Sequence, residues 1–259
     1  MKKGKKDNMA DYTIAEEYVL PSEGKIYGVP FDARVKLRSM TVQEEMKRLS
    51  ADGNSNRTLC EIIDDCLITK LPISCYDLAV PDYEYLLHKL RVVSYGKDYK
   101  MFVGCPHCGQ QQPYTADLDT LKVNTISVEE YQKQLIFKLP VSKKEIKLRI
   151  PTARLEDTIK DKIDEFNKEQ PSYQGNIAPL ITMETMIESI DGSKMSYIEL
   201  QQLIKKMSVA DYNYLDQKLQ KLNSCFGLDK RIDIKCSKCK GSFSTFFRFS
   251  TEFFRPSID

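Results

Sequence analysis

Two short stretches of sequence decide how this chain can fold: GCPHCG at 104–109 and KCSKCKG at 235–241. Each stretch, called a knuckle below, places two cysteines three positions apart, so that both thiolates can bind one cation across a tight turn. Pro106, Gly109 and Gly241 favour turns, the glycines because they adopt positive φ at little cost. Two knuckles at the ends of expected strands predict one structural Zn²⁺ held by four thiolates. The predicted ligands are Cys105, Cys108, Cys236 and Cys239.

Other uses of the knuckles fit the sequence less well. A redox CxxC pair sits in a thioredoxin-like βαβ context, which neither knuckle has. A catalytic zinc ion keeps a position open for water beside three protein ligands, whereas four cysteines close the shell. His107 lies between the first two cysteines, and we expect its ring to point away from the metal. The remaining cysteines lie singly among apolar residues and are expected in the core: Cys60, Cys66, Cys75 and Cys225.

An internal duplication organises the rest of the chain. LAVPDYEYLLHKL at 78–90 aligns without a gap with MSVADYNYLDQKL at 207–219, and seven of the thirteen positions are identical. Each segment then runs into its own knuckle, and VKLRSMT at 35–41 matches IKLRIPT at 146–152 upstream. We therefore predict an α+β fold of two related α+β repeats, each ending in a zinc-knuckle β-hairpin and joined as a pseudo-dimer by one zinc site of four cysteines.

The predicted boundaries follow from this pairing. The first repeat is expected at 13–125 and the second at 126–259, after a disordered basic tail at 1–12 that begins MKKGKKD. In the first repeat, two strands are expected around Val29-Pro30, followed by a helix capped by Thr41. Gly96 and Gly227 are expected to end the long helix of each repeat. The strands KMFVG at 100–104 and RIDIK at 231–235 should lead into the knuckles.

Composition and motifs argue against several classes of protein. The chain has 259 residues, and 39 Lys and Arg balance 37 Asp and Glu, so charge implies no polyanionic partner. No stretch approaches the roughly 18 apolar residues of a membrane span, and we expect a soluble protein without a membrane partner. With only His88 and His107, and no phosphate loop, HExxH or GxSxG motif, we predict no catalytic residues and no enzyme.

The C-terminal segment SFSTFFRFSTEFFRPSID at 242–259 holds more phenylalanines than one small hairpin can bury. Some of them should meet another surface, which could belong to the rest of this chain or to a partner. The candidate partner-binding residues are Phe249, Phe253, Phe254 and Arg255. Stacking on nucleic-acid bases is a weaker alternative, because only Arg248 and Arg255 are available there for phosphates.

Several motifs outside the knuckles carry a family resemblance. YVLPSEGKIYG at 18–28, VKLRSMTVQEE at 35–45, the DYxYLxxKL helix before GCPHCG, and EFFRPS at 252–257 together resemble baseplate hub proteins of T-even-type contractile-tailed bacteriophages. The resemblance implies a non-enzymatic factor of the central baseplate hub, made in the host cytoplasm, with other phage tail and hub proteins as partners. It fits both a hub subunit of the virion tail and an assembly chaperone. The alternative is a zinc-ribbon nucleic-acid binder, for which Lys235, Lys238 and Lys240 supply a small basic face.

Overall fold

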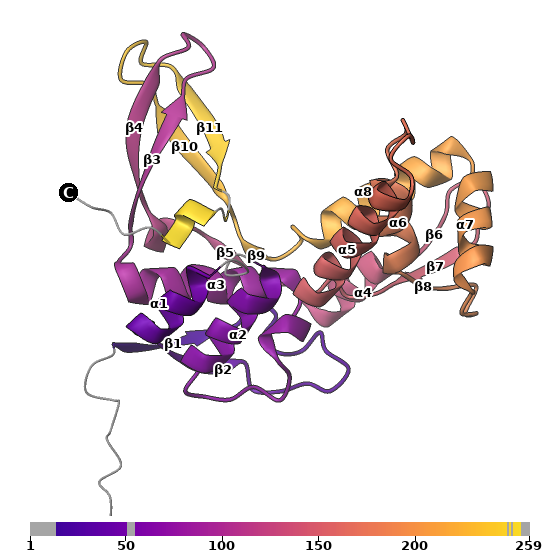
Figure 1. Ribbon diagram of the computed structural model, residues 1–259, viewed down its shortest axis with the longest axis horizontal. Helices are drawn as coiled ribbons and strands as arrows, with labels where there is room; N and C mark the ends of the chain where they lie inside the picture. The colour runs from indigo at the N-terminus through magenta and orange to yellow at the C-terminus, as the bar shows by residue number, and fades with distance from the viewer. Residues whose placement is uncertain (1–13, 51–54, 248, 250, 255–259) are drawn as a thin grey trace, which may run out of the picture.

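The computed structural model describes residues 14–50, 55–247, 249 and 251–254. The tail expected at 1–12 lies outside these residues. The described chain has the mixed α+β composition that the sequence predicts, arranged as two helix-containing lobes and an arm of two long hairpins that rises from the first lobe (Figure 1).

The first lobe combines one hairpin with three helices. Strands β1 (Ala15–Val19) and β2 (Arg34–Arg38) pair antiparallel, with Tyr18 opposite Val35. The helical elements that follow are α1 (Val42–Arg48), α2 (Asn56–Cys66), the 3-10 turn η2 (Cys75–Asp77) and α3 (Val80–Tyr95). Thr41 caps α1 as predicted, because its side chain and that of Glu44 form a reciprocal capping box.

Of the two strands expected on either side of Val29-Pro30, the second is confirmed as β2, but the strand expected before Val29 is wrong. Residues 20–33 form a loop between β1 and β2 instead. The loop is held by the buried carboxylate of Asp82 in α3, which accepts hydrogen bonds from the Ser22 backbone N–H (3.0 Å) and the Tyr27 hydroxyl (2.6 Å). These bonds satisfy the loop's polar groups without a strand ladder.

The second lobe contains five helices and a three-stranded sheet. The strands β6 (Ile136–Lys138), β7 (Glu145–Leu148) and β8 (Ile187–Ile190) pair in the order β6-β7-β8. The helices are α4 (Val128–Leu135), α5 (Ala153–Glu169), α6 (Ala178–Met186), α7 (Tyr197–Lys206) and α8 (Val209–Leu222). Asp211, near the start of α8, accepts hydrogen bonds from the backbone N–H groups of Val141 (2.7 Å) and Ser142 (3.0 Å) in the β6–β7 loop.

The arm is built from two parts of the chain that are distant in sequence. Its hairpins are β3 (Asp98–Gly104) with β4 (Gln111–Asp117), and β10 (Arg231–Lys235) with β11 (Ser242–Phe246), which confirms the two expected strands before the knuckles. At its base lie η3 (Leu118–Thr120), the short pair β5 (Val123–Asn124) and β9 (Gly227–Leu228), and η4 (Thr251–Phe254). The second hairpin therefore lies beside the first, away from the helices that precede it (Figure 1).

The two glycines expected to end the long helices have different roles. Gly96 caps α3 with φ +83°, as predicted. Helix α8 instead ends at Leu222 with Asn223 as its cap, so Gly227 does not end it. Gly227 has φ +90° and an added Cβ would lie 2.7 Å from Cβ of Pro81, so this glycine allows β9 to approach the start of α3.

The buried apolar residues form two clusters. The first surrounds α3 and includes Ile232, Ile234, Phe247, Phe253 and Phe254 from the C-terminal part of the chain. The second lies between the β6-β7-β8 sheet and helices α4, α6, α7 and α8. The cysteines expected in the core are buried at Cys60, Cys66 and Cys75 and half-buried at Cys225.

The lobes meet where α5 begins. The Val80 backbone N–H donates to the Pro151 carbonyl oxygen (2.9 Å), and Ala79 forms a single antiparallel bridge with Thr152. Arg154 makes a two-pronged contact with the carboxylate of Asp77 (2.6 and 2.8 Å). Asp157 accepts hydrogen bonds from Asn56 and Tyr76 of the first lobe. This contact is called the joint below.

Arg91 fixes the C-terminal segment to α3. Its side chain is fully buried, and its guanidinium donates to the carbonyl oxygens of Phe253 (2.8 Å), Gly96 (2.7 Å) and Asp98 (3.3 Å). The flat fork of a guanidinium suits three acceptors that lie in different directions. Arg91 thus joins α3, the first strand of the arm and the C-terminal turn η4.

Replacing Arg91 by lysine should test this role. Arg91→Lys keeps the charge but leaves at least one buried carbonyl without a donor, so we expect the free energy of unfolding to fall by about 2–4 kcal/mol. Urea unfolding followed by circular dichroism measures the change. Arg34→Lys, at an exposed pair with Asp32, is the control and should leave the transition unchanged. Equal transitions for the two variants would contradict the role assigned to Arg91.

Candidate metal centre

The two knuckles adopt the same turn. In the first, the Cys105 N–H donates to Gln110 O and the Gly109 N–H to Cys105 O, both at 2.9 Å. In the second, the Cys236 N–H donates to Gly241 O (2.9 Å) and the Lys240 N–H to Cys236 O (3.1 Å). The matching hydrogen bonds place the two cysteines of each knuckle on one side of its turn.

The positive φ expected at Gly241 occurs one residue earlier. Gly109 has φ +70° as expected, but its counterpart in the second knuckle is Lys240, with φ +62°. Gly241 has a different role, because an added Cβ would lie 3.0 Å from Cδ2 of His107 in the first knuckle, which is a tight contact. The glycine therefore permits close approach between the knuckles.

The turns of the two hairpins lie side by side at the outer end of the arm (Figure 1). The four cysteine sulfurs of these turns form one cluster. The Cys105 and Cys239 sulfurs are 3.7 Å apart, as are those of Cys108 and Cys236, and all four lie within 4.8 Å of one another. A metal ion with thiolate bonds of about 2.3 Å places neighbouring ligands of a tetrahedron about 3.8 Å apart. The sulfurs are too far apart for disulfides and fit one tetrahedral metal ion.

Side chains beside the sulfurs also link the two hairpins. Gln112 is buried, and its side-chain oxygen accepts from the Ser237 backbone N–H (2.7 Å) and hydroxyl (2.8 Å). Nε2 of His107 lies 3.2 Å from the Ser242 carbonyl oxygen, and His107 is not one of the four clustered residues. Sequence reasoning missed Gln112, whose only signal is a polar residue at an inward-facing strand position.

Hydrogen bonds and crowding give the thiols unequal acidity. The Cys239 backbone N–H, together with that of Lys238, lowers the pKa of the Cys236 thiol to about 6. For Cys239, the Gly241 N–H favours the thiolate, but burial and the neighbouring thiols raise the pKa to about 11. Ionisation of Cys236 is therefore favoured, and ionisation of Cys239 beside it is opposed. A bound divalent cation removes this conflict, because it stabilises all four thiolates.

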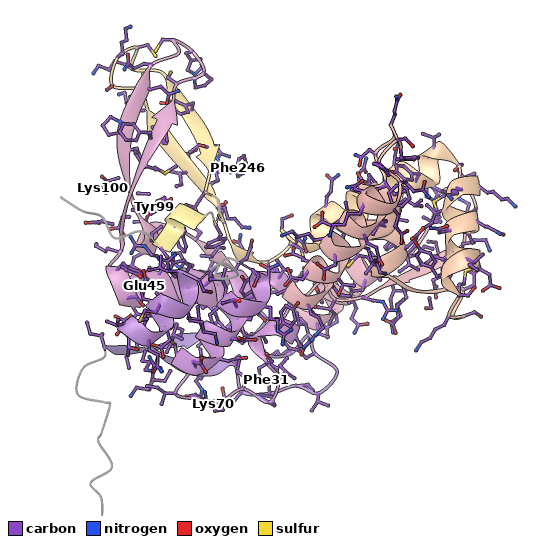
Figure 2. All side chains as sticks on the ribbon, viewed as in Figure 1. Phe31, Glu45, Lys70, Tyr99, Lys100 and Phe246 are labelled. Atoms are coloured by element: carbon purple, nitrogen blue, oxygen red, sulfur yellow. The ribbon has the colours of Figure 1, made fainter. Side chains whose placement is uncertain are left out.

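The other residues singled out in the sequence lie in different surroundings. Phe253 and Phe254 are buried in the first core cluster, and Phe249 is half-buried against Phe247 and Phe253. Arg255 lies outside the described residues. The exposed aromatic side chains of the arm are Phe102 of β3 and Phe246 of β11, the latter pointing outward from its strand in Figure 2. Lys235, Lys238 and Lys240 are exposed beside the second knuckle.

The second histidine of the chain lies inside the first lobe. His88 is buried on α3, with Nε2 3.0 Å from the Leu118 carbonyl oxygen. Burial lowers its pKa to about 4, so the ring is neutral at neutral pH and helps to join α3 to the base of the arm. Among the described helices, none is long and apolar enough to cross a membrane.

Fold and site together define a mixed α+β protein whose two distant hairpins bring together four cysteines that could hold a metal ion. A family model described as T4 bacteriophage base plate protein matches residues 11–255. The chain belongs to this family of phage tail proteins, as the sequence motifs suggested, and membership favours a structural role over an enzymatic one. No curated protein and no solved structure gives a significant match.

Metal binding at the cluster should depend steeply on pH. Because the thiols must lose their protons to bind a cation, we expect the affinity for Co²⁺ to fall as the pH is lowered from about 8 to about 6. Titration of reduced, metal-free protein, followed by the sulfur-to-cobalt absorption of a tetrahedral site, measures this. Cys225→Ser, which changes a cysteine outside the cluster, should behave as wild type. An affinity that does not change with pH would exclude thiolate ligation.

Proposed function

We propose that this protein is a non-enzymatic component of the central baseplate hub, either a structural subunit or an assembly chaperone, that acts through protein–protein contacts. The observation that carries the proposal is the cluster of four cysteines at the outer end of an arm that projects from the lobes, because a metal ion held by four thiolates has no open coordination position for chemistry. The partners are other phage tail and hub proteins, met in the host cytoplasm during assembly.

The metal in this proposal is one structural Zn²⁺. Tetrahedral sites of four thiolates suit zinc or iron, and zinc brings no redox chemistry. Two-stranded hairpins are marginally stable in isolation, so an ion shared between them would stabilise both. The proposed ligands are Cys105 and Cys108 from the first hairpin and Cys236 and Cys239 from the second.

The proposal includes the internal duplication, with repeats at 13–125 and 126–259. The first support for the duplication is the register of the paired strands. Tyr18 pairs with Val35 in the first lobe, and the aligned pair in the second is Phe137 with Ile146. Downstream, Thr41 and Thr152 stand at matching positions after KLR and cap α1 and α5. The same strand pairing and the same helix cap therefore occur in the same order in both repeats.

Further support comes from long-range contacts that recur in both lobes. Leu37 forms an isolated bridge to Leu67 directly after α2, while Leu148 of β7 pairs with Ile187 directly after α6. Asp82 and Asp211, which occupy matching positions of the aligned helices, each bind the loop of the preceding hairpin. In a pseudo-dimer of this kind, the zinc ion joins the last element of one repeat to the last element of the other.

A shared site makes a sharp prediction about stoichiometry. Protein purified without added metal should contain one zinc per chain, and either Cys108→Ser or Cys236→Ser should lower the zinc content toward zero, because three ligands from two hairpins cannot close the shell. Elemental analysis measures this, with Cys66→Ser as the matched control. Retention of one zinc by Cys236→Ser, or two zinc ions in the wild type, would contradict a shared site.

The role in the hub can be tested by reconstitution. We expect the purified protein to bind at least one hub or tail protein of its own phage, with the arm required for binding. Phe246→Ser and Phe102→Ser, at exposed arm positions, should weaken binding without unfolding the chain. Binding to no tail protein, or strongly salt-dependent binding to DNA or RNA through the lysines of the second knuckle, would overturn the proposed role.

A further inference from the structure

The joint uses two different surfaces, and each has a counterpart elsewhere in the chain. The front surface belongs to the first lobe and consists of Tyr76, Asp77, Ala79 and Val80. The back surface belongs to the second lobe and consists of Pro151, Thr152, Ala153, Arg154 and Asp157. By the alignment of the repeats, the second lobe also has a front surface, at Lys205, Lys206, Ser208 and Val209. The first lobe likewise has a back surface, at Met40, Thr41, Val42, Gln43 and Met46.

Residues of these two counterpart surfaces are exposed, whereas the residues at the matching positions of the joint are buried. Val80 is 4% exposed in the joint, whereas its counterpart Val209 is 74% exposed. Ala153 is fully buried, whereas its counterpart Val42 is 76% exposed, and Met46 beside it is 68% exposed. Val42 and Met46 are one helical turn apart on α1, so they form a single apolar patch.

The counterpart surfaces also have backbone groups that match the hydrogen-bonded groups of the joint and could form the same bond. In the joint, the Val80 N–H donates to the Pro151 carbonyl oxygen. The corresponding groups are the Val209 N–H and the Met40 carbonyl oxygen, and neither has a hydrogen-bond partner among the described residues. The first N–H groups of a helix lack intrahelical acceptors, so Val209 can donate outward.

The unused front surface of the second lobe has room for larger side chains than the front surface of the first lobe has in the joint. In the first lobe, Tyr27 fills the corner beside the front surface: its hydroxyl bonds to Asp82 (2.6 Å) and accepts from the Ala79 N–H (3.0 Å). The matching β6–β7 loop, 139–144, is shorter than 20–33, and a groove of about 580 Å³ lies there. Its lining includes Leu139, Val141, Met195, Leu203, Met207 and Asp211.

The unused back surface of the first lobe has larger apolar side chains than the back surface in the joint. Met40 stands in place of Pro151, Val42 in place of Ala153, and Met46 in place of Asp157. The ion pair of the joint is not repeated, since Lys206 and Gln43 replace Asp77 and Arg154. A contact between these surfaces would therefore depend mainly on apolar burial.

We propose that the protein associates with a second copy of itself head to tail, the front surface of the second lobe in one copy binding the back surface of the first lobe in the next. The contact repeats the joint between molecules. Because its two sides differ, it leaves one surface free at each end and builds a ring or a filament. This inference rests on the duplication in the proposed function.

The test uses two variants that each block one surface. Val209→Glu blocks the front surface and Val42→Glu the back surface, and both positions begin a helix, where glutamate is tolerated. Sedimentation velocity over a range of concentrations should show self-association of the wild type. Each variant alone should associate at least on the order of tenfold more weakly, because a buried charge opposes the contact. Val29→Glu, at an 82% exposed position of the 20–33 loop, is the matched control.

Mixing the variants distinguishes this contact from others. In an equimolar mixture, the intact front of Val42→Glu can bind the intact back of Val209→Glu, so two-chain species should reappear and grow no further. A wild type that stays monomeric, self-association unaffected by both substitutions, or a mixture that stays monomeric would each overturn the proposal. Zinc content is measured on the same samples: one zinc in a monomeric protein would refute the self-association and leave the proposed zinc-braced hub role standing.

Discussion

Two hairpins that are distant in sequence meet at the sulfur cluster at the outer end of the arm. Each hairpin is a sheet of only two strands, which has little stability of its own. The base of the arm is fixed differently: Arg91 binds carbonyl groups from the end of α3, from β3 and from η4. The C-terminal phenylalanines pack there against Tyr99, which lies close to η4 in Figure 2. The base of the arm is therefore fixed by contacts within the chain, and the metal ion proposed for the sulfur cluster would fix its outer end.

Sequence reasoning succeeded where a short pattern contains its own physical cause. The capping box of Thr41 and Glu44, the helix end at Gly96 and the grouping of the four cysteines all follow from local stereochemistry or ligand chemistry. It failed where a distant contact decides the outcome. Gly227 is required by Pro81, which lies far away in the sequence, and no local pattern reveals that neighbour.

The C-terminal phenylalanines illustrate the same limit. Their number predicts burial against some surface, but only the return of β10 and β11 to the first lobe makes that surface available within the chain. Similarly, the 20–33 loop contains strand-like residues, and the buried carboxylate of Asp82 binds its polar groups instead. In both cases a residue of α3 that is distant in sequence holds the segment: Arg91 binds the C-terminal segment and Asp82 binds the 20–33 loop.

The differences between the two lobes are as informative as their likeness. Matching positions that satisfy buried polar groups keep their chemistry, as with Asp82 and Asp211 or Thr41 and Thr152. Matching positions on the front and back surfaces differ in size and charge. A single exposed apolar residue is common on a protein surface, but Val42 and Met46 lie one helical turn apart and form a patch, and exposed apolar patches are typical of interaction sites. Burial of these positions by another polypeptide gives the apolar character a physical cause.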